Sequence, residues 1–346
     1  MIDGLRALLD ELVPQPGLSG HETAGIQGRM ADALRPGADR VWTDHTGNVI
    51  ACFGRDDAPH KTAVLAHMDT VGFLVKTVQD DGILRVTPVG GVNVKALPGA
   101  AVQIFTGQGA ISGVIGVRSQ HLAQPGDSAA SLDDLYVQVD PVDAPAIEIT
   151  APVLYAPQIV RLGERRIAAP YLDNRAGCAI LVALGRTLAA LPDGHAVYLI
   201  ATAQEETTCL GALGALRQVG PERAIVIDGT LAYDTPETRG QGAVRLGGGP
   251  VLTAFLYVSG LNGWHAHPGL REHLKQGCAA QGIPFQQDAI RGLMSDARAA
   301  ALLGIPSAVI GIPMRSKHAP LEMVDLGDLA YIHQLISMEL NNPFML

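Results

Sequence analysis

The sequence lacks several features that mark whole classes of protein. No apolar run approaches the roughly 20 residues that a membrane-spanning helix needs. The N-terminal stretch is acidic and breaks at Pro14, so it is not expected to be a signal peptide. Cysteines are few, and they form neither a CxxC pair nor a disulfide-like framework: Cys52, Cys178, Cys209 and Cys278. Such usage is typical of a reducing compartment, and we expect a cytoplasmic protein.

Positive charge is also scarce. The 346 residues include 25 Lys and Arg against 34 Asp and Glu, which gives a formal net charge of −9. A surface of this sign repels phosphate backbones and anionic lipid, so neither a nucleic acid nor a membrane is expected as a partner. Some of the negative charge would be neutralised if acidic side chains held metal cations.

Strand and helix patterns alternate along most of the chain. Continuous apolar runs that end in polar residues occur at 61–69, 195–206, 223–230 and 307–318. Runs of this form are typical of strands covered on both faces. Helical patterns are present at 2–13, 22–35, 174–191, 209–218, 268–281, 290–303 and 326–340. The alternation predicts an α/β fold with a mostly parallel sheet sandwiched by helices.

Residues 78–166 have a different pattern. Short β-rich pieces are separated there by Gly, Pro and Asp, with little helical periodicity. We expect an inserted small all-β domain at 78–166, which divides a catalytic domain into residues 1–77 and 167–346. The length of the chain agrees with one large domain and a second, smaller one.

Histidine and carboxylate side chains stand where the apolar runs end. They are His67 and Asp69, Glu205 and Glu206, Asp228, and His318. Ligands of open α/β sheets bind beyond the carboxyl ends of the strands, so these side chains are expected to converge. One such residue is more often structural than functional, but a set at successive strand ends favours a site. Imidazole and carboxylate donors without thiolates suit hydrolytic zinc, cobalt or manganese.

Three short motifs add detail to this hypothesis. Asp69 lies two residues after His67 and is expected to orient its imidazole. Asp173 opens a helix, where it is either a helix cap or a carboxylate shared between two cations. Glu205 and Glu206 would point in opposite directions on extended backbone, so that one binds metal and the other faces the water.

Taken together, these residues resemble the co-catalytic zinc aminopeptidases of the glutamyl aminopeptidase and tetrahedral (TET) aminopeptidase family. The resemblance covers essentially the whole chain. It is carried by His67-Met-Asp69, Asp173-Asn-Arg-Ala-Gly177, Gln204-Glu205-Glu206, Asp228 and His318, with support from Ser19-Gly20-His-Glu22, Gly248-Gly249-Pro250 and Pro313-Met-Arg315.

The resemblance implies an enzyme that hydrolyses N-terminal residues from peptides. It implies two divalent metal ions per subunit, with zinc first and cobalt or manganese as alternatives. His67 and Asp228 would bind one ion and Glu206 and His318 the other. Asp173 would bridge both, and Glu205 would be the catalytic base. The family also implies a homo-oligomer built from dimers, partly through the inserted domain, in which the stretch 120–134 is unusual.

A related family of deacetylases and desuccinylases fits the residues around His67 at least as well. Asp69 and Asp173 are 104 positions apart (173 − 69), which leaves room for an inserted domain. In the rival family this gap is short, so the spacing favours the aminopeptidases. The alternative reaction is deacylation of N-acyl amino acids or small amides, and a non-catalytic scaffold is disfavoured because all five ligands are present.

Some positions depart from the family pattern or lie outside it. Thr70 replaces an acid, Asn174 replaces the second Asp of the usual pair, and Ser295-Asp296 stands where Thr-Asp is common. These departures concern substrate preference and metal affinity. The segment Trp264-His-Ala-His267 could line a substrate pocket or bind metal, but a surface loop is the favoured interpretation.

Overall fold

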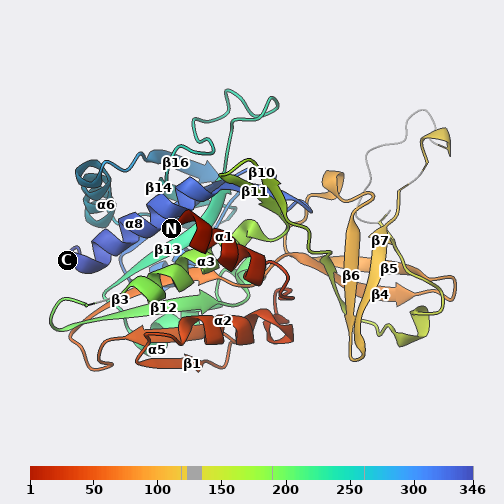
Figure 1. Ribbon diagram of the computed structural model, residues 1–346, viewed down its shortest axis with the longest axis horizontal. Helices are drawn as coiled ribbons and strands as arrows, with labels where there is room; N and C mark the ends of the chain where they lie inside the picture. Colours follow the sequence, from red (N-terminus) through yellow and green to blue (C-terminus); the bar gives the residue numbers. More distant parts are fainter. Residues whose placement is uncertain (118, 123–134, 189, 261, 346) are drawn as a thin grey trace.

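Two β structures organise the chain: a large sheet flanked by helices, and a barrel that projects from one side of it (Figure 1). The computed structural model describes the whole chain except residues 118, 123–134, 189, 261 and 346. Most of the stretch 120–134 singled out above therefore lies outside the described residues. Among the described residues, no helix combines the length and hydropathy that crossing a membrane requires.

The large sheet has nine strands in the described part of the chain. Across it run β1 (Arg40–Thr43), β2 (Val49–Phe53), β12 (His195–Thr202), β3 (His60–His67), β13 (Arg223–Leu231), β17 (Ser307–Met314), β14 (Val251–Tyr257) and β15 (Gly263–His265), and β16 (Gln286–Arg291) pairs with β14. The central four, β12, β3, β13 and β17, are mutually parallel. They are buried almost throughout, which explains their continuous apolar sequences.

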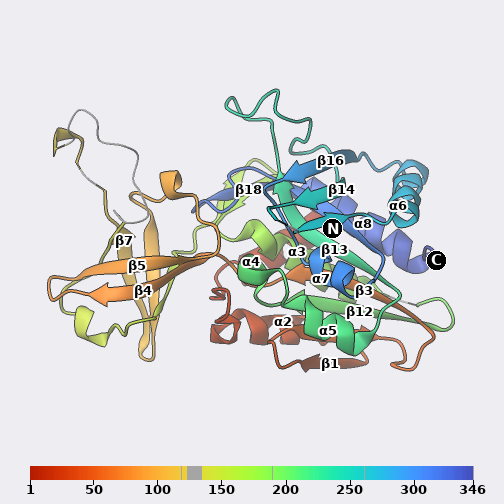
Figure 2. The ribbon, with the colours of Figure 1, turned by 180° about the vertical axis from the view of Figure 1, so that it is seen from behind.

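Helices cover both faces of this sheet. One face packs against α1 (Ile2–Leu12), α2 (Ile26–Leu34), α3 (Leu172–Thr187), α6 (Pro268–Gln281) and α8 (Leu326–Asn341) (Figure 1). The opposite face packs against α5 (Ala212–Val219) and α7 (Ala297–Leu302), which Figure 2 shows from behind. The prediction of an α/β fold with a mainly parallel sheet between helices is confirmed.

Two helices are shorter than their sequence patterns suggest. The segment 290–303 is not one helix, because β16 ends at Arg291 and α7 begins only at Ala297. Gly292, with a φ of +88°, makes the turn between them. Likewise α5 begins at Ala212 and not at 209, since Cys209 has a left-handed backbone that ends the preceding turn.

The β-rich segment forms a closed antiparallel barrel. Its strands are β4 (Gly72–Val78), β5 (Ile83–Val89), β8 (Val137–Gln138), β7 (Gly109–Ile115), β6 (Ala101–Thr106) and β9 (Pro152–Tyr155), in that order around it. Phe73, Ile104 and Val153 are fully buried in its interior. The described strands close into a ring, so the barrel forms a hydrophobic core of its own without helices.

A third, small sheet follows the barrel in sequence. It contains β10 (Val160–Leu162), β11 (Arg166–Ala169) and β18 (Glu322–Asp325). Here β10 pairs with β11 and β11 pairs with β18, so residues 160–169 join a strand of the C-terminal part and not the barrel. The remaining short elements are α4 (Glu205–Thr208) and the 3-10 turns η1 (Glu22–Ala24), η2 (Val94–Ala96), η3 (Gln120–Leu122) and η5 (Ala144–Ala146).

The segment around Trp264 is not a surface loop. Trp264 is 2% exposed in β15, and its indole Nε1 donates a hydrogen bond to Ser307 Oγ at 2.9 Å. His267 Nδ1 accepts the backbone N–H of Leu270 and so caps α6. The aromatic ring and the second histidine therefore have structural roles, which the sequence alone did not indicate.

This packing predicts the cost of truncating Trp264. Trp264→Ala should lower the free energy of unfolding by about 3–5 kcal/mol, because a large buried ring leaves a cavity and Ser307 loses its partner. Trp264→Phe should cost clearly less, since most of the ring volume remains. The measurement is equilibrium unfolding in urea, with the exposed His265→Ala as control. A Trp264→Ala loss no larger than that of the control would contradict this account.

Candidate metal centre

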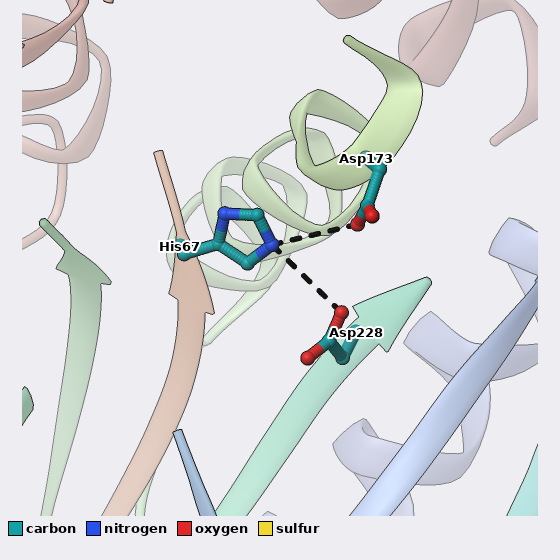
Figure 3. Close-up of side chains that lie close together, drawn as sticks. All are labelled: His67, Asp173 and Asp228. Carbon is teal, nitrogen blue, oxygen red and sulfur yellow. Dashed lines mark ion pairs between the residues drawn. The ribbon is translucent and has the colours of Figure 1, made fainter. Parts of the chain in front are cut away.

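The side chains predicted from the sequence meet at one edge of the large sheet. His67 is the last residue of β3, Glu205 and Glu206 follow β12 in α4, and His318 follows β17. Asp228 differs from the expectation, because β13 continues to Leu231 and the aspartate lies within the strand. Its position still places the carboxylate beside His67 (Figure 3).

Asp173 lies in the irregular first turn of α3, where its backbone and that of Asn174 are not helical. Its side chain does not cap the helix. Asn174 does so instead: its Oδ1 accepts the N–H of Gly177 at 3.0 Å, and its Nδ2 donates to the carbonyl of Ile227 at 2.8 Å. An ionised aspartate could not make the second bond. Asn174 thus anchors the turn, and the carboxylate of Asp173 is left for the site.

Two groups of potential metal ligands share Asp173. One contains His67, Asp173 and Asp228, and the other Asp173, Glu206 and His318. In the first, His67 Nε2 lies 3.4 Å from Asp173 Oδ1 and 3.8 Å from Asp228 Oδ1 (Figure 3). In the second, His318 Nε2 lies 3.4 Å from Asp173 Oδ2 and 3.3 Å from Glu206 Oε2. Each oxygen of Asp173 therefore faces a different histidine.

These distances fit cation ligation. The donors of a tetrahedral zinc site are separated by about 3.3 Å, given metal bonds of about 2.0–2.1 Å. Several buried atoms of the two groups also have no hydrogen-bond partner among the described residues: Asp173 Oδ1, Glu206 Oε1, Asp228 Oδ1 and His318 Nε2. Buried polar atoms are normally paired, so unpaired atoms gathered in one place fit donors that a cation would satisfy.

Asp69 contacts His67, as predicted, and it also binds the backbone of the glutamate pair. The imidazole Nδ1 lies 3.1 Å from the backbone carbonyl of Asp69 and 3.6 Å from its carboxylate Oδ1. The two carboxylate oxygens accept the backbone N–H groups of Glu205, at 3.0 Å, and Glu206, at 3.1 Å. One fully buried residue thus fixes the imidazole and both glutamates.

The geometry expected for the glutamate pair is wrong. Glu205 and Glu206 begin the short helix α4 and do not lie on extended backbone. They diverge because successive helical residues are rotated around the helix axis. Glu206 faces His318, whereas Glu205 Oε2 lies 3.9 Å from His67 Nε2 and its Oε1 accepts the thiol of Cys209. The division of the pair between two positions nevertheless holds.

The turns that carry these residues are strained. Gln204 and His318 have φ values of +59° and +64°, a region that side chains rarely adopt. In each case a buried glutamate accepts the backbone N–H. Glu22 binds that of Gln204 at 3.0 Å, and Glu322 binds that of His318 at 2.5 Å. Glu322 also accepts the N–H of Asp173 at 2.8 Å, so it holds two turns of the site together.

Burial and mutual repulsion shift the pKa values of the acidic groups in this cluster. Burial, with smaller effects of nearby carboxylates, raises the pKa of Glu206 to about 7 and that of Glu322 to about 8. The pKa of Glu205 is raised well above its ordinary value, first by burial. Burial acts in the same direction on Asp173, but Lys317, His318 and His67 outweigh it and hold its pKa well below the usual range.

Sequence reasoning missed Lys317, which directly precedes His318. Its ammonium Nζ lies 2.7 Å from Asp173 Oδ2 and 3.6 Å from Asp228 Oδ1, and it donates to the carbonyl of Gly229 at 3.1 Å. The side chain is only 12% exposed. The available signal was a lysine next to a proposed ligand. The sequence cannot tell whether such a lysine is buried in the site or solvated at the surface.

The departures from the family pattern have structural roles here. The Thr70 hydroxyl donates to the carbonyl of Gly17 at 3.1 Å and is fully buried. Ser295 Oγ accepts the N–H of Ala297 at the start of α7. Asp296 is buried and accepts the hydroxyl of Thr202, and burial raises its pKa to about 7. None of these contacts replaces a residue of the two ligand groups.

Comparison with known proteins shows the family of the chain. The family model of the M42 glutamyl aminopeptidases matches residues 47–335, which is most of the chain. The chain belongs to this family. Similar proteins include the lysyl aminopeptidase of Pyrococcus furiosus, which is 33% identical over 93% of this chain and 92% of the relative.

Solved structures of two peptidases have the same fold. The aminopeptidase APDkam598 of Desulfurococcus kamchatkensis is 30% identical, with a TM-score of 0.92 over 99% of this chain and 96% of that one. The TET1 peptidase of Pyrococcus horikoshii is 25% identical, with a TM-score of 0.84 over 97% and 99% of the two chains. The latter protein assembles into a tetrahedron or a large octahedral shell. Membership of this metallopeptidase family implies divalent metal ions.

The shared carboxylate predicts different metal stoichiometries for two isosteric variants. Asp228→Asn should weaken one bound cation, whereas Asp173→Asn should weaken both, because only Asp173 belongs to both ligand groups. The affinity loss is expected to be about 10–100-fold or more per affected cation. Calorimetric titration of metal-stripped protein with Zn²⁺ or Co²⁺ measures it. If each variant lost the affinity for only one metal ion, Asp173 would not be a ligand shared by the two groups.

Proposed function

We propose that the chain is a dinuclear metallo-aminopeptidase that removes N-terminal residues from peptides. The observation that carries this proposal is the position of Asp173, whose two oxygens face two separate histidine and carboxylate groups. Membership of an aminopeptidase family supports the reaction. His67 and Asp228 would hold one cation, Glu206 and His318 the other, and Asp173 both.

The donor set suits zinc, with cobalt or manganese as alternatives, because imidazole and carboxylate ligands occur without a thiolate. When bound, a pair of such ions polarises the scissile carbonyl, lowers the pKa of an attacking water and anchors a free amine. The protein supplies fixed ligands for this purpose. Asp69 and Glu322 hold the backbone of the liganding turns in place.

Glu205 would be the general base. It is buried and belongs to neither ligand group, and its Oε2 is 3.9 Å from Nε2 of His67, a member of the first group. Its raised pKa makes the carboxylate a stronger base. It can therefore accept a proton from water and return it to the leaving nitrogen. Asp69 would act as a positioning residue, since it binds the N–H of Glu205 and orients His67.

Replacing the base should separate turnover from metal binding. Glu205→Gln should keep both cations but lower kcat by about 10²–10⁴-fold, because the amide preserves shape and cannot take a proton. Steady-state kinetics and metal analysis of the same preparation measure the two effects. The exposed Glu148→Gln is a matched control. Normal turnover of Glu205→Gln would sink the assignment of the base.

The alternative is a deacylase that acts on N-acyl amino acids or small amides. A single substrate panel distinguishes the two reactions: aminoacyl-anilides against N-acyl amino acids, with Zn²⁺, Co²⁺ or Mn²⁺ added after chelator stripping. We expect cleavage of substrates with a free amine and none after the amine is acylated. Turnover confined to the acylated compounds would establish the alternative instead.

We also propose that the chain divides into a catalytic domain and an inserted oligomerisation domain. The sequence predicts bounds of 1–77 with 167–346 for the first and 78–166 for the second, but the barrel strands run from β4 (Gly72–Val78) to β9 (Pro152–Tyr155), so the insert begins earlier and ends earlier than the sequence pattern indicates. The closed barrel supports an autonomous insert, and exposed apolar side chains on it support contact between subunits: Val117, Leu122, Val142 and Ile149. The shells formed by the related TET1 peptidase point to a homo-oligomer. The four unpaired cysteines support a cytoplasmic location.

A further inference from the structure

Lys317 lies within the site, but the proposed mechanism gives it no role. Its ammonium contacts one oxygen from each side of the centre: Asp173 Oδ2, which faces His318, and Asp228 Oδ1, which faces His67. It therefore lies between the two ligand groups. A surface lysine would leave its amine in water, but this one is only 12% exposed and is fixed by a third contact, the carbonyl of Gly229.

The ammonium and the divalent cations compete for the same oxygens. A zinc ion bound to Asp173 Oδ2 at about 2.0–2.2 Å would lie within about 5 Å of Nζ, by the lengths of the two contacts. Like charges at this separation repel strongly in a buried site. The carboxylates of the centre, however, need a positive partner when they hold no metal, since unpaired buried charge is strongly destabilising.

We propose that Lys317 is an internal counter-cation of the metal centre, which stabilises the metal-free protein and must be displaced before both divalent ions bind. The side chain of Lys317 can be displaced, because its unbranched four-carbon stem can carry the amine away from Asp173 and toward solvent. The consequence is unequal loading. One ion binds readily, and the last equivalent binds more weakly because it must replace an ammonium already paired with the shared carboxylate.

This inference rests on the proposed metal site and is tested by metal binding, independently of turnover. Lys317→Met keeps the length of the side chain and removes its charge. Metal-stripped wild type, Lys317→Met and the exposed control Lys76→Met are titrated with Zn²⁺ by calorimetry. We expect the dissociation constant of the weaker equivalent to fall about tenfold or more in Lys317→Met and to stay unchanged in the control.

Thermal unfolding of the same samples tests whether Lys317 stabilises the metal-free protein. Metal-free Lys317→Met should unfold at a lower temperature than metal-free wild type. Saturating Zn²⁺ should raise the unfolding midpoint of Lys317→Met by more than that of wild type. Weaker binding of Zn²⁺ by Lys317→Met, or unchanged affinity together with an unchanged metal-free midpoint, would overturn the proposal. Wild-type protein that binds no divalent ion would instead refute the proposed function.

A measurement on the wild-type chain covers the case in which Lys317→Met does not fold. Reductive methylation with formaldehyde and a borohydride, followed by peptide mass spectrometry, reports the accessibility of each lysine. We expect the Lys317 amine to be protected in metal-free protein and labelled at least several-fold faster with saturating Zn²⁺, while Lys76 labels equally in both. Labelling of Lys317 that does not change with Zn²⁺ would overturn the displacement.

Discussion

The carboxylate of Asp173 is the point on which the rest of the site depends. Each of its oxygens faces a different histidine, at 3.4 Å in both cases, so the two ligand groups are joined through a single side chain. Such a position requires that the carboxylate not be used to hold the local backbone. Asn174 caps α3 in its place, and Glu322 binds the backbone N–H of Asp173, so other residues hold the turn and the carboxylate contacts only side chains of the site, among them Lys317.

Electrostatics makes this arrangement costly without a cation. Asp69, Asp173, Glu205, Asp228 and Glu322 are all buried at one edge of the sheet, and burial opposes ionisation of carboxyl groups. The protein offsets part of this cost with His67, His318 and Lys317, and backbone N–H groups satisfy Asp69 and Glu322. Within the two ligand groups, oxygens of Asp173, Asp228 and Glu206 still have no hydrogen-bond partner among the described residues. A dinuclear metal centre is the chemistry that these leftover atoms fit.

Strain and support occur together around this centre. Gln204 and His318 adopt left-handed backbone conformations that cost about 1–3 kcal/mol each. Buried glutamates bind their N–H groups: Glu22 from the N-terminal part of the chain and Glu322 from β18. The residues that carry the chemistry are thus kept in place by acids from distant segments. This explains why the motif around Glu22 accompanies the ligand motifs in sequence.

The sequence by itself determined the buried central strands of the sheet, the residues that meet at its edge and the family, because continuous apolar runs and fixed motif spacings are local features of the chain. It also indicated the β-rich insert from the change in pattern. It did not reveal that α4 carries the glutamate pair, that Trp264 is buried, or that Glu322 and Lys317 belong to the centre. Those facts depend on which distant segments meet in space. A buried lysine beside two aspartates has the same local sequence as a solvated one, and only tertiary packing decides between them.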